Sequence, residues 1–240
     1  MKTLRTIAIT ALLVVGLMVA IRTFAFQSFT IPSPSMDPTL LVGDYLYVSK
    51  FAYGYSRHSL PFGAPIIAGR VLAAEPRIGD VVVFKSPVDS ATDYIKRVVG
   101  IPGDRVRVTG GVLHINGQAV GRDRAADHLE GAGSSARRFA QYAETLPNGR
   151  RHLIREVTDD GPLDNTPDVL VPPGHCFVMG DNRDNSADSR VPSVIGLVPF
   201  ANLVGRADLI FFSSDGTARL WQVWKWPVAI RFRRMMRTVE

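Results

Sequence analysis

Short apolar runs separated by glycine- and proline-rich turns occupy most of this 240-residue chain, and they constrain its fold more than any other feature. Runs rich in valine, isoleucine and aromatic residues, bounded by such turns, are typical of β-strands. The runs that predict strands are 45–48, 81–84, 94–99, 105–109, 112–115, 152–157, 169–171, 176–179 and 209–212. One of them is followed by Asn116-Gly117, a strong β-hairpin signal. The pattern predicts an all-β chain whose core is an antiparallel barrel or sandwich.

Two stretches lack this pattern. Residues 51–77 are rich in glycine, proline and aromatic residues, without a sustained period, and are expected to form an ordered loop region. Residues 121–151 are polar and charged, and their alanine-rich pieces are compatible with a short helix.

An apolar segment at residues 7–26 precedes the strand-like part of the chain. With Arg22 reaching towards the interface, its length of about 20 residues is enough to span a bilayer. Two basic residues before it place the N-terminus in the cytoplasm and the rest of the chain outside. A cleaved signal peptide is the competing interpretation. Because Phe24-Ala25-Phe26 puts phenylalanines where a cleavage site needs small residues, a retained single-pass anchor is favoured.

The amino-acid composition limits which partners and which kinds of functional site are expected. The formal charge is +6, but the basic residues are scattered and no nucleic-acid motif accompanies them, so a membrane surface is the expected acidic partner. The single cysteine, Cys176, and five dispersed histidines have no metal-ligand spacing. We therefore expect no metal, no cofactor and no nucleic acid. In the tail at 220–234, all three tryptophans are interspersed with arginine and lysine. This composition is typical of a segment in the headgroup layer of a membrane, and it is equally compatible with a C-terminus that packs on the rest of the protein.

A proline-rich stretch, 32–40, follows the apolar segment and carries two hydroxyls, Ser33 and Ser35. Its prolines restrict φ and remove backbone donors, so it is expected to be a rigid, kinked, extended loop that presents Ser35. Lys96 lies in the apolar strand 94–99. If the lysine is buried, desolvation lowers its pKa and makes the neutral amine a usable base for a serine hydroxyl. Ser35 and Lys96 are thus a possible nucleophile and base, although neither residue alone indicates this.

The densest polar run is Gly180 to Arg190, with the sequence G-D-N-R-D-N-S-A-D-S-R. A calcium-type loop does not fit, because Arg183 interrupts it and the required glycine and distal glutamate are missing. Alternating charges with asparagine and serine indicate an internally hydrogen-bonded loop that holds another group in place.

Four stretches together resemble the ordered sequence boxes of bacterial type I signal peptidases, also called leader peptidases. They are P-S-P-S-M-D-P-T-L-L-V-G-D, R-I-G-D-V-V-V-F, D-Y-I-K-R-V-V-G-I-P-G-D and G-D-N-R-D-N-S-A-D-S-R. The resemblance is weak over residues 112–171. Asp37 departs from the pattern, since this position is frequently apolar in the family, and it is expected to alter the entrance to the site.

The resemblance implies roles for particular residues. Ser35 would be the nucleophile and Lys96 its general base. The Ser33 hydroxyl and the Ser35 backbone N–H would form the oxyanion hole. Ser186 would orient Lys96. Charged residues that would support this pair are Asp188, Arg190 and Arg97.

The resemblance also implies how substrate binds. A preprotein would add a β-strand between residues 29–32 and 93–96, and small pockets would admit only small side chains at the first and third positions before the cut. The residues expected to bind substrate are Phe29, Ile31, Pro32, Leu40, Asp93, Tyr94 and Ile95. The activity implied is a serine endopeptidase that removes N-terminal signal peptides from exported preproteins.

The expected organisation follows from the family's architecture. A cytoplasmic N-terminus and one transmembrane helix precede a catalytic β core that a smaller, variable β-rich domain interrupts. The boundaries are 1–6 for the N-terminus, 7–26 for the anchor, 27–111 and 172–215 for the core, 112–171 for the inserted domain and 216–240 for a membrane-proximal tail. The expected location is the bacterial inner membrane, with the catalytic domain on the periplasmic side.

Three other functions share features with this sequence. A self-cleaving repressor-type protease shares the serine–lysine pair, but the apolar N-terminal segment stands where that class has a DNA-binding domain. A processing peptidase dedicated to one pilus or conjugation protein stays open. A non-catalytic, membrane-tethered domain that binds extended peptides is the alternative that is not an enzyme.

Overall fold

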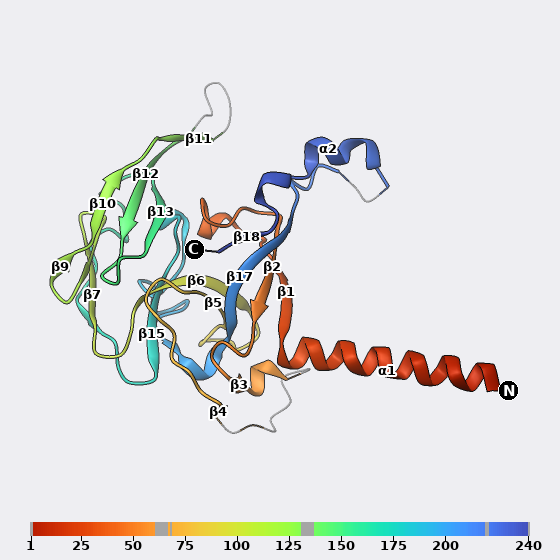
Figure 1. Cartoon of the computed structure of the whole chain (residues 1–240). Helices are drawn as coiled ribbons and strands as arrows, with labels where there is room; N and C mark the ends of the chain where they lie inside the picture. The colour runs from red at the N-terminus through yellow and green to blue at the C-terminus, as the bar shows by residue number, and fades with distance from the viewer. Residues whose placement is uncertain (1, 61–66, 68, 131–136, 219–220, 240) are drawn as a thin grey trace.

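The computed structural model describes residues 2–60, 67, 69–130, 137–218 and 221–239. Strands dominate these residues and pair antiparallel in several sheets, and one long apolar helix precedes them (Figure 1). The predicted β class and the helix before it are therefore confirmed.

The largest sheet has the order β1-β2-β17-β5-β6-β15-β16, with β18 pairing β17. Its strands are β1 (Phe26–Thr30), β2 (Asp44–Ser49), β5 (Val81–Lys85), β6 (Asp93–Gly100), β15 (His175–Met179), β16 (Val198–Pro199), β17 (Leu203–Ser213) and β18 (Arg237–Thr238). The first four residues of β5 are all buried, because this strand lies between β17 and β6 with hydrophobic clusters on both faces. The sheet thus holds β6, the strand of Lys96, at a fixed register.

Among the described residues, three smaller sheets contain the other strands. One has the order β14-β7-β8-β9, a second has β10-β12-β11 with β13 pairing β12, and β3 pairs β4. Their bounds are β3 (Tyr55–Ser56), β4 (Arg70–Val71), β7 (Arg105–Thr109), β8 (Val112–Ile115), β9 (Gln118–Ala119), β10 (Gly121–Arg124), β11 (His128–Glu130), β12 (Arg137–Thr145), β13 (Arg151–Glu156) and β14 (Val169–Leu170). Asn116 and Gly117, at φ 54° and 80°, form the two-residue turn between β8 and β9, as predicted.

The short helix compatible with residues 121–151 is wrong for the part of that segment that the structure describes. Strands β10, β11 and β12 occupy it instead, and residues 131–136 lie outside the described residues, as do 61–66 and 68 of the predicted loop region. Six residues of β12 pair with β13, and Phe139 is buried. Strand pairing and burial override the weak helical preference of the alanines.

Helix α1 (Lys2–Phe24) extends away from the sheets (Figure 1). Its segment Thr3–Phe24 has a mean hydropathy of 2.3 and is exposed over most of its length, so its length and composition suffice to cross a membrane. The Tyr55 hydroxyl donates a hydrogen bond of 2.7 Å to the Phe24 carbonyl, and the two rings meet edge to face. The end of the helix is therefore attached to the β part of the chain.

The C-terminal tail combines packing with exposure. The short helices of the tail are η7 (Val223–Lys225), α2 (Trp226–Ala229) and η8 (Phe232–Arg234). The short helices in other described parts of the chain are η1 (Pro34–Met36), η2 (Arg57–Ser59), η5 (Arg183–Asn185) and η6 (Phe200–Asn202). Arg234 pairs with the buried Asp44 at 2.5 Å, which holds the tail on β2. Trp221 and Trp224 are nevertheless 67% and 69% exposed, and Leu220 lies outside the described residues.

Candidate active site

The Ser35 loop is held in place by the loop that follows β15. Pro34 begins the short helix η1, which Ser35 shares, so residues 34–36 form a helical turn where an extended loop was predicted. The Asn182 backbone N–H donates to the Ser35 carbonyl at 3.2 Å, and its side-chain amide donates to the Pro34 carbonyl at 3.1 Å. Ser35 itself is only 8% exposed. Its position is therefore set by two hydrogen bonds that Asn182, a distant residue in the chain, donates to backbone carbonyls of the loop.

Lys96 on β6 contacts the Ser35 hydroxyl directly. The Lys96 Nζ donates to the Ser35 Oγ at 2.6 Å, and the lysine is 3% exposed. Burial lowers the pKa of Lys96 to about 8, with Arg190 acting in the same direction and Asp188 and Asp181 opposing it. A lysine with this pKa is partly neutral near pH 7, and its neutral amine can accept a hydroxyl proton.

Ser33 adds a second hydroxyl to the site. Its Oγ lies 3.3 Å from the Ser35 Oγ, and unlike Ser35 it is exposed. A hydroxyl at this distance can turn towards an oxygen that forms next to the nucleophile.

The loop from Gly180 to Arg190 is internally hydrogen-bonded, as its composition indicates. The Ser186 hydroxyl and the Gly180 backbone N–H donate to the Asp188 Oδ2, at 2.8 and 3.0 Å. Arg190 donates to both oxygens of Asp188 at 2.9 Å. Although burial opposes it, the charge and hydrogen bonds of Arg190 hold the pKa of Asp188 below its ordinary value. Asp188 is therefore an ionised centre that joins the ends of the loop.

Arg97, next to Lys96 on β6, joins the strand to the same loop. Its Nε and Nη2 donate to the two oxygens of Asp181 at 2.9 and 2.8 Å, and its Nη1 donates to the Gly79 carbonyl at 2.9 Å. Thr39 also donates to Asp181, at 2.5 Å. This fully buried pair connects β6, the Ser35 loop and the Gly180 loop.

The sequence patterns do not single out Asp181, Asn182 and Thr39 as site residues. All three lie within the sequence boxes, and the polar composition of Gly180 to Arg190 was the available signal. A hydrogen-bond partner more than 140 positions away, such as Asp181 for Thr39, leaves no local pattern.

Buried charges extend from this site into the sheet of β12 and β13. His152 on β13 lies 3.4 Å from Glu144 and 3.8 Å from Asp181. Arg155, also on β13, pairs with Asp37 in the Ser35 loop. Asp37 is thus buried and paired, and the segment with the weakest resemblance supports the nucleophile loop through it.

The residues that are predicted to bind substrate do not all lie in the same part of the structure. Those in the hydrophobic cluster that contains Met36, the neighbour of Ser35, are Phe29, Ile31, Leu40 and Ile95. Tyr94 faces the opposite side of β6 and stacks on Phe84, because successive strand residues alternate between faces. Asp93 pairs with Lys85 at 3.0 Å, and Pro32 is exposed.

Two strand edges lie near the nucleophile. β1 is a terminal strand of the largest sheet, and residues 93–96 of β6 pair with β5 only. Within the described ranges, neither edge has a second paired strand. Cys176 is buried and free, and no group of three or more metal-ligand side chains is found in the described part of the chain.

A buried lysine whose pKa is lowered to about 8, in contact with a serine hydroxyl, is the arrangement of serine hydrolases that use lysine as the base. Comparison with known proteins gives the family: residues 4–212 match the profile described as signal peptidase, peptidase S26. The signal peptidases I of Rickettsia canadensis and Rickettsia typhi are each 39% identical over 212 residues, 85% of this chain and 78% of theirs. The chain belongs to the signal peptidase I family, and its function is that of a signal peptidase I, a serine endopeptidase.

A solved structure was also found. It is a signal peptidase I from Enterococcus faecalis V583, which is 25% identical, covers 55% of this chain and 97% of its own, and superimposes with a TM-score of 0.32.

Proposed function

We propose that this chain cleaves signal peptides with Ser35 as nucleophile and Lys96 as general base. The observation that carries the proposal is the 2.6 Å contact between the buried Lys96 amine and the Ser35 hydroxyl. In its neutral form, Lys96 takes the Oγ proton as Ser35 bonds to the carbonyl carbon before the cut. The proton then passes to the departing amine, which leaves an ester on Ser35. Lys96 next takes a proton from the water whose oxygen bonds to the ester carbon, and returns it to the Ser35 Oγ as the bond between that Oγ and the ester carbon breaks.

The oxyanion of each tetrahedral intermediate would be stabilised by the Ser33 hydroxyl and the Ser35 backbone N–H. Ser33 is exposed beside the nucleophile, so its hydroxyl is free to reorient as charge develops. Lys96 would be oriented by Ser186, which donates a hydrogen bond to the ionised Asp188. The negative charge of Asp188 is balanced by its ion pair with Arg190. Arg97 would fix the strand next to Lys96 through Asp181.

The preprotein would bind as an extended strand between β1 and the first half of β6. Both edges offer backbone groups for pairing, which supports this mode. Side chains of the cluster around Met36, namely Phe29, Ile31, Leu40 and Ile95, would limit the size of the residues before the cut. Pro32, Asp93 and Tyr94 would contact the strand from its flanks.

We further propose that α1 anchors the chain in the bacterial inner membrane, with the β sheets on the periplasmic side. The exposed tryptophans of the tail would then contact the lipid headgroups. In Figure 1, α1 and α2 both project to the right, away from the sheet of β10–β13, which is consistent with one membrane-facing side. The division into a barrel- or sandwich-like core and a domain inserted at 112–171 is part of this proposal, although β7 pairs with β8 and β14 across that boundary.

The test is cleavage of a preprotein with alanine at the first and third positions before the cut, using the detergent-solubilised chain. Cleavage after the alanine is expected, and phenylalanine at the first position should lower kcat/KM on the order of 100-fold or more, because the pocket excludes bulk. Binding without cleavage would favour the non-catalytic peptide-binding domain. Activity restricted to one pilus or conjugation protein would favour the dedicated processing peptidase.

The pH dependence gives a second test. Because only the neutral Lys96 amine can accept a proton, kcat/KM should rise about tenfold per pH unit below pH 8 and level off above the Lys96 pKa of about 8. An ordinary lysine would place this inflection near 10.4. A profile that is flat between pH 6 and pH 10 would contradict Lys96 as the base.

A further inference from the structure

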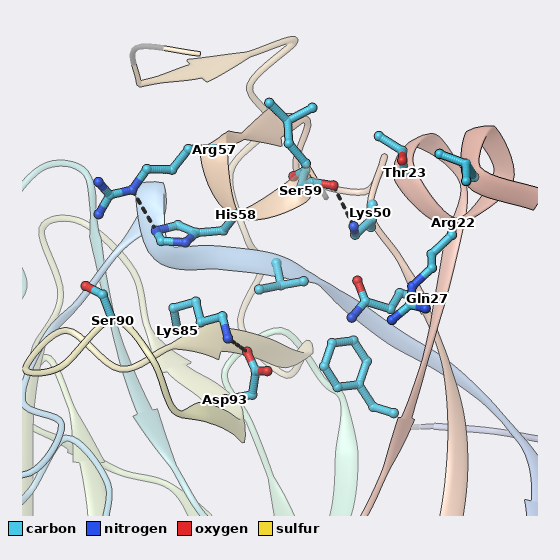
Figure 2. Close-up of a pocket in the computed structure, with 14 residues that line it drawn as sticks. Arg22, Thr23, Gln27, Lys50, Arg57, His58, Ser59, Lys85, Ser90 and Asp93 are labelled. Atoms are coloured by element: carbon cyan, nitrogen blue, oxygen red, sulfur yellow. Dashed lines mark hydrogen bonds and ion pairs between the residues drawn. The ribbon is translucent and has the colours of Figure 1, made fainter. Parts of the chain in front are cut away.

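A cavity of about 790 Å³ lies beside the end of α1, and two of the proposed substrate contacts, Phe29 and Asp93, are among its lining residues. It is enclosed by α1, β1, the residue after β2, η2 and the adjoining ends of β5 and β6 (Figure 2). Neither Ser35 nor Lys96 lines it.

The cavity carries an excess of positive charge. Four of its lining residues are cations, namely Arg22, Lys50, Arg57 and Lys85, and Asp93 is its one carboxylate. Asp93 pairs with Lys85 at 3.0 Å. Among the residues that the structure describes, no carboxylate lies within ion-pair distance of the other three cations.

Lys50 makes this charge unusual, because its side chain is buried. It is 3% exposed, and its ammonium donates to the Ser59 carbonyl at 2.6 Å. In Figure 2, Lys50 lies between Ser59 and the side chain of Arg22. Burial and the charge of Arg22 lower the pKa of Lys50 to about 8. Burying a cation without a countercharge is costly, so a bound anion would stabilise this arrangement.

A second group reports the same positive field. The pKa of His58, which lines the cavity, is lowered by burial and then by the charges of Arg57 and Lys85. The cations that line the cavity therefore extend from Arg22 to Arg57.

The position of the cavity indicates where an anion would come from. Arg22 lies in the last turn of α1, and the bond from Tyr55 to Phe24 holds this turn against the β part of the chain. If α1 spans a bilayer, residues at its end lie among the headgroups of the outer leaflet. The cavity also has an apolar part, formed by Val19, Phe29, Leu60 and Val204, which suits the first carbons of a lipid chain.

We propose that this cavity binds the headgroup phosphate of an anionic phospholipid, with Arg22 and Lys50 as its main cationic contacts and Arg57 at the far side. The proposal rests on the proposed function in one respect, that α1 is a membrane anchor. It adds a lipid site, separate from the reacting serine, that holds the β sheets against the bilayer.

The experiment is native mass spectrometry of the full chain in detergent, with phosphatidylglycerol or phosphatidylcholine added. The wild type should retain one phosphatidylglycerol in preference to phosphatidylcholine. Arg22→Gln and Lys50→Gln should each weaken retention about fivefold, the effect of about 1 kcal/mol per cation near an anionic lipid. Arg5→Gln, which removes a cation from the other end of α1, is the matched control and should change neither retention nor cleavage.

Any of the following results would contradict the assignment of the cavity to an anionic phospholipid. Equal retention of both lipids, or retention that Arg22→Gln leaves unchanged, would exclude a specific phosphate site; Arg22 is exposed, so this variant is expected to fold. Displacement of phosphatidylglycerol by millimolar inorganic phosphate would indicate a site for soluble anions. Displacement by a signal peptide would assign the cavity to substrate. Cleavage of the preprotein in lipid-free detergent tests the proposed function separately, since the serine and lysine lie outside the cavity.

Discussion

Replacing Lys96 by alanine is expected to lower kcat/KM for a preprotein on the order of 10⁴-fold, because the Ser35 hydroxyl then loses the base that takes its proton. Ser35→Ala should lower it at least as far, since no nucleophile remains. Lys96→Arg is the discriminating variant. It keeps a positive charge on β6, but a guanidinium does not lose its proton near neutral pH. It should therefore be as inactive as Lys96→Ala.

The measurement is preprotein cleavage at pH 8 in detergent, with thermal unfolding of each variant as a check on folding. Lys225→Ala, which removes an exposed lysine of the tail, is the control and should retain wild-type activity. Substantial activity in Lys96→Arg would show that the charge of Lys96 matters rather than its basicity. Activity in Lys96→Ala at the wild-type level would remove Lys96 from the mechanism.

Gly180→Ala is expected to lower activity at least about 100-fold, because there is no room for a methyl group at this position. A Cβ would lie 2.2 Å from the Ser186 Oγ and 2.5 Å from the Ser35 carbonyl oxygen. The Ser35 oxygen belongs to the backbone, so relief requires movement of the nucleophile loop itself. A displacement of about 1 Å in an active site costs on the order of 100-fold in rate.

Gly121→Ala is the matched control. Nothing lies within 4 Å of a Cβ at Gly121, and its φ is not in the left-handed region, so activity and stability should be unchanged. Overpacking at Gly180 should also destabilise the fold by about 1–3 kcal/mol, measured by denaturant unfolding. Wild-type kcat/KM in Gly180→Ala would mean that the contact between the Gly180 loop and Ser35 does not position the nucleophile.

Local patterns were sufficient for nine of the eighteen strands in the described residues. β5 is predictable because four consecutive apolar residues form a strand buried on both faces. β7 alternates between exposed and buried residues, as a strand with one solvent-facing side does. The Asn116-Gly117 turn follows from the positive φ values that these two residues tolerate. The strands of residues 121–145 were not predictable, since their polar sequences become strands through pairing with one another and with β13.

Sequence patterns predicted which side chains belong to the candidate site, but not how these side chains are arranged. A serine in a proline-rich loop and a lysine in an apolar strand are recognisable because φ restriction and hydrophobic patterning act over a few neighbouring residues. Their contact, the burial that lowers the Lys96 pKa, and the anchoring of the Ser35 loop by Asn182 depend on segments far apart in the chain. The cationic cavity also depends on contacts between segments that are far apart in the sequence. Arg22 and Lys50 become neighbours only when α1 and β2 are packed together, because electrostatic and steric contacts act through space rather than along the sequence.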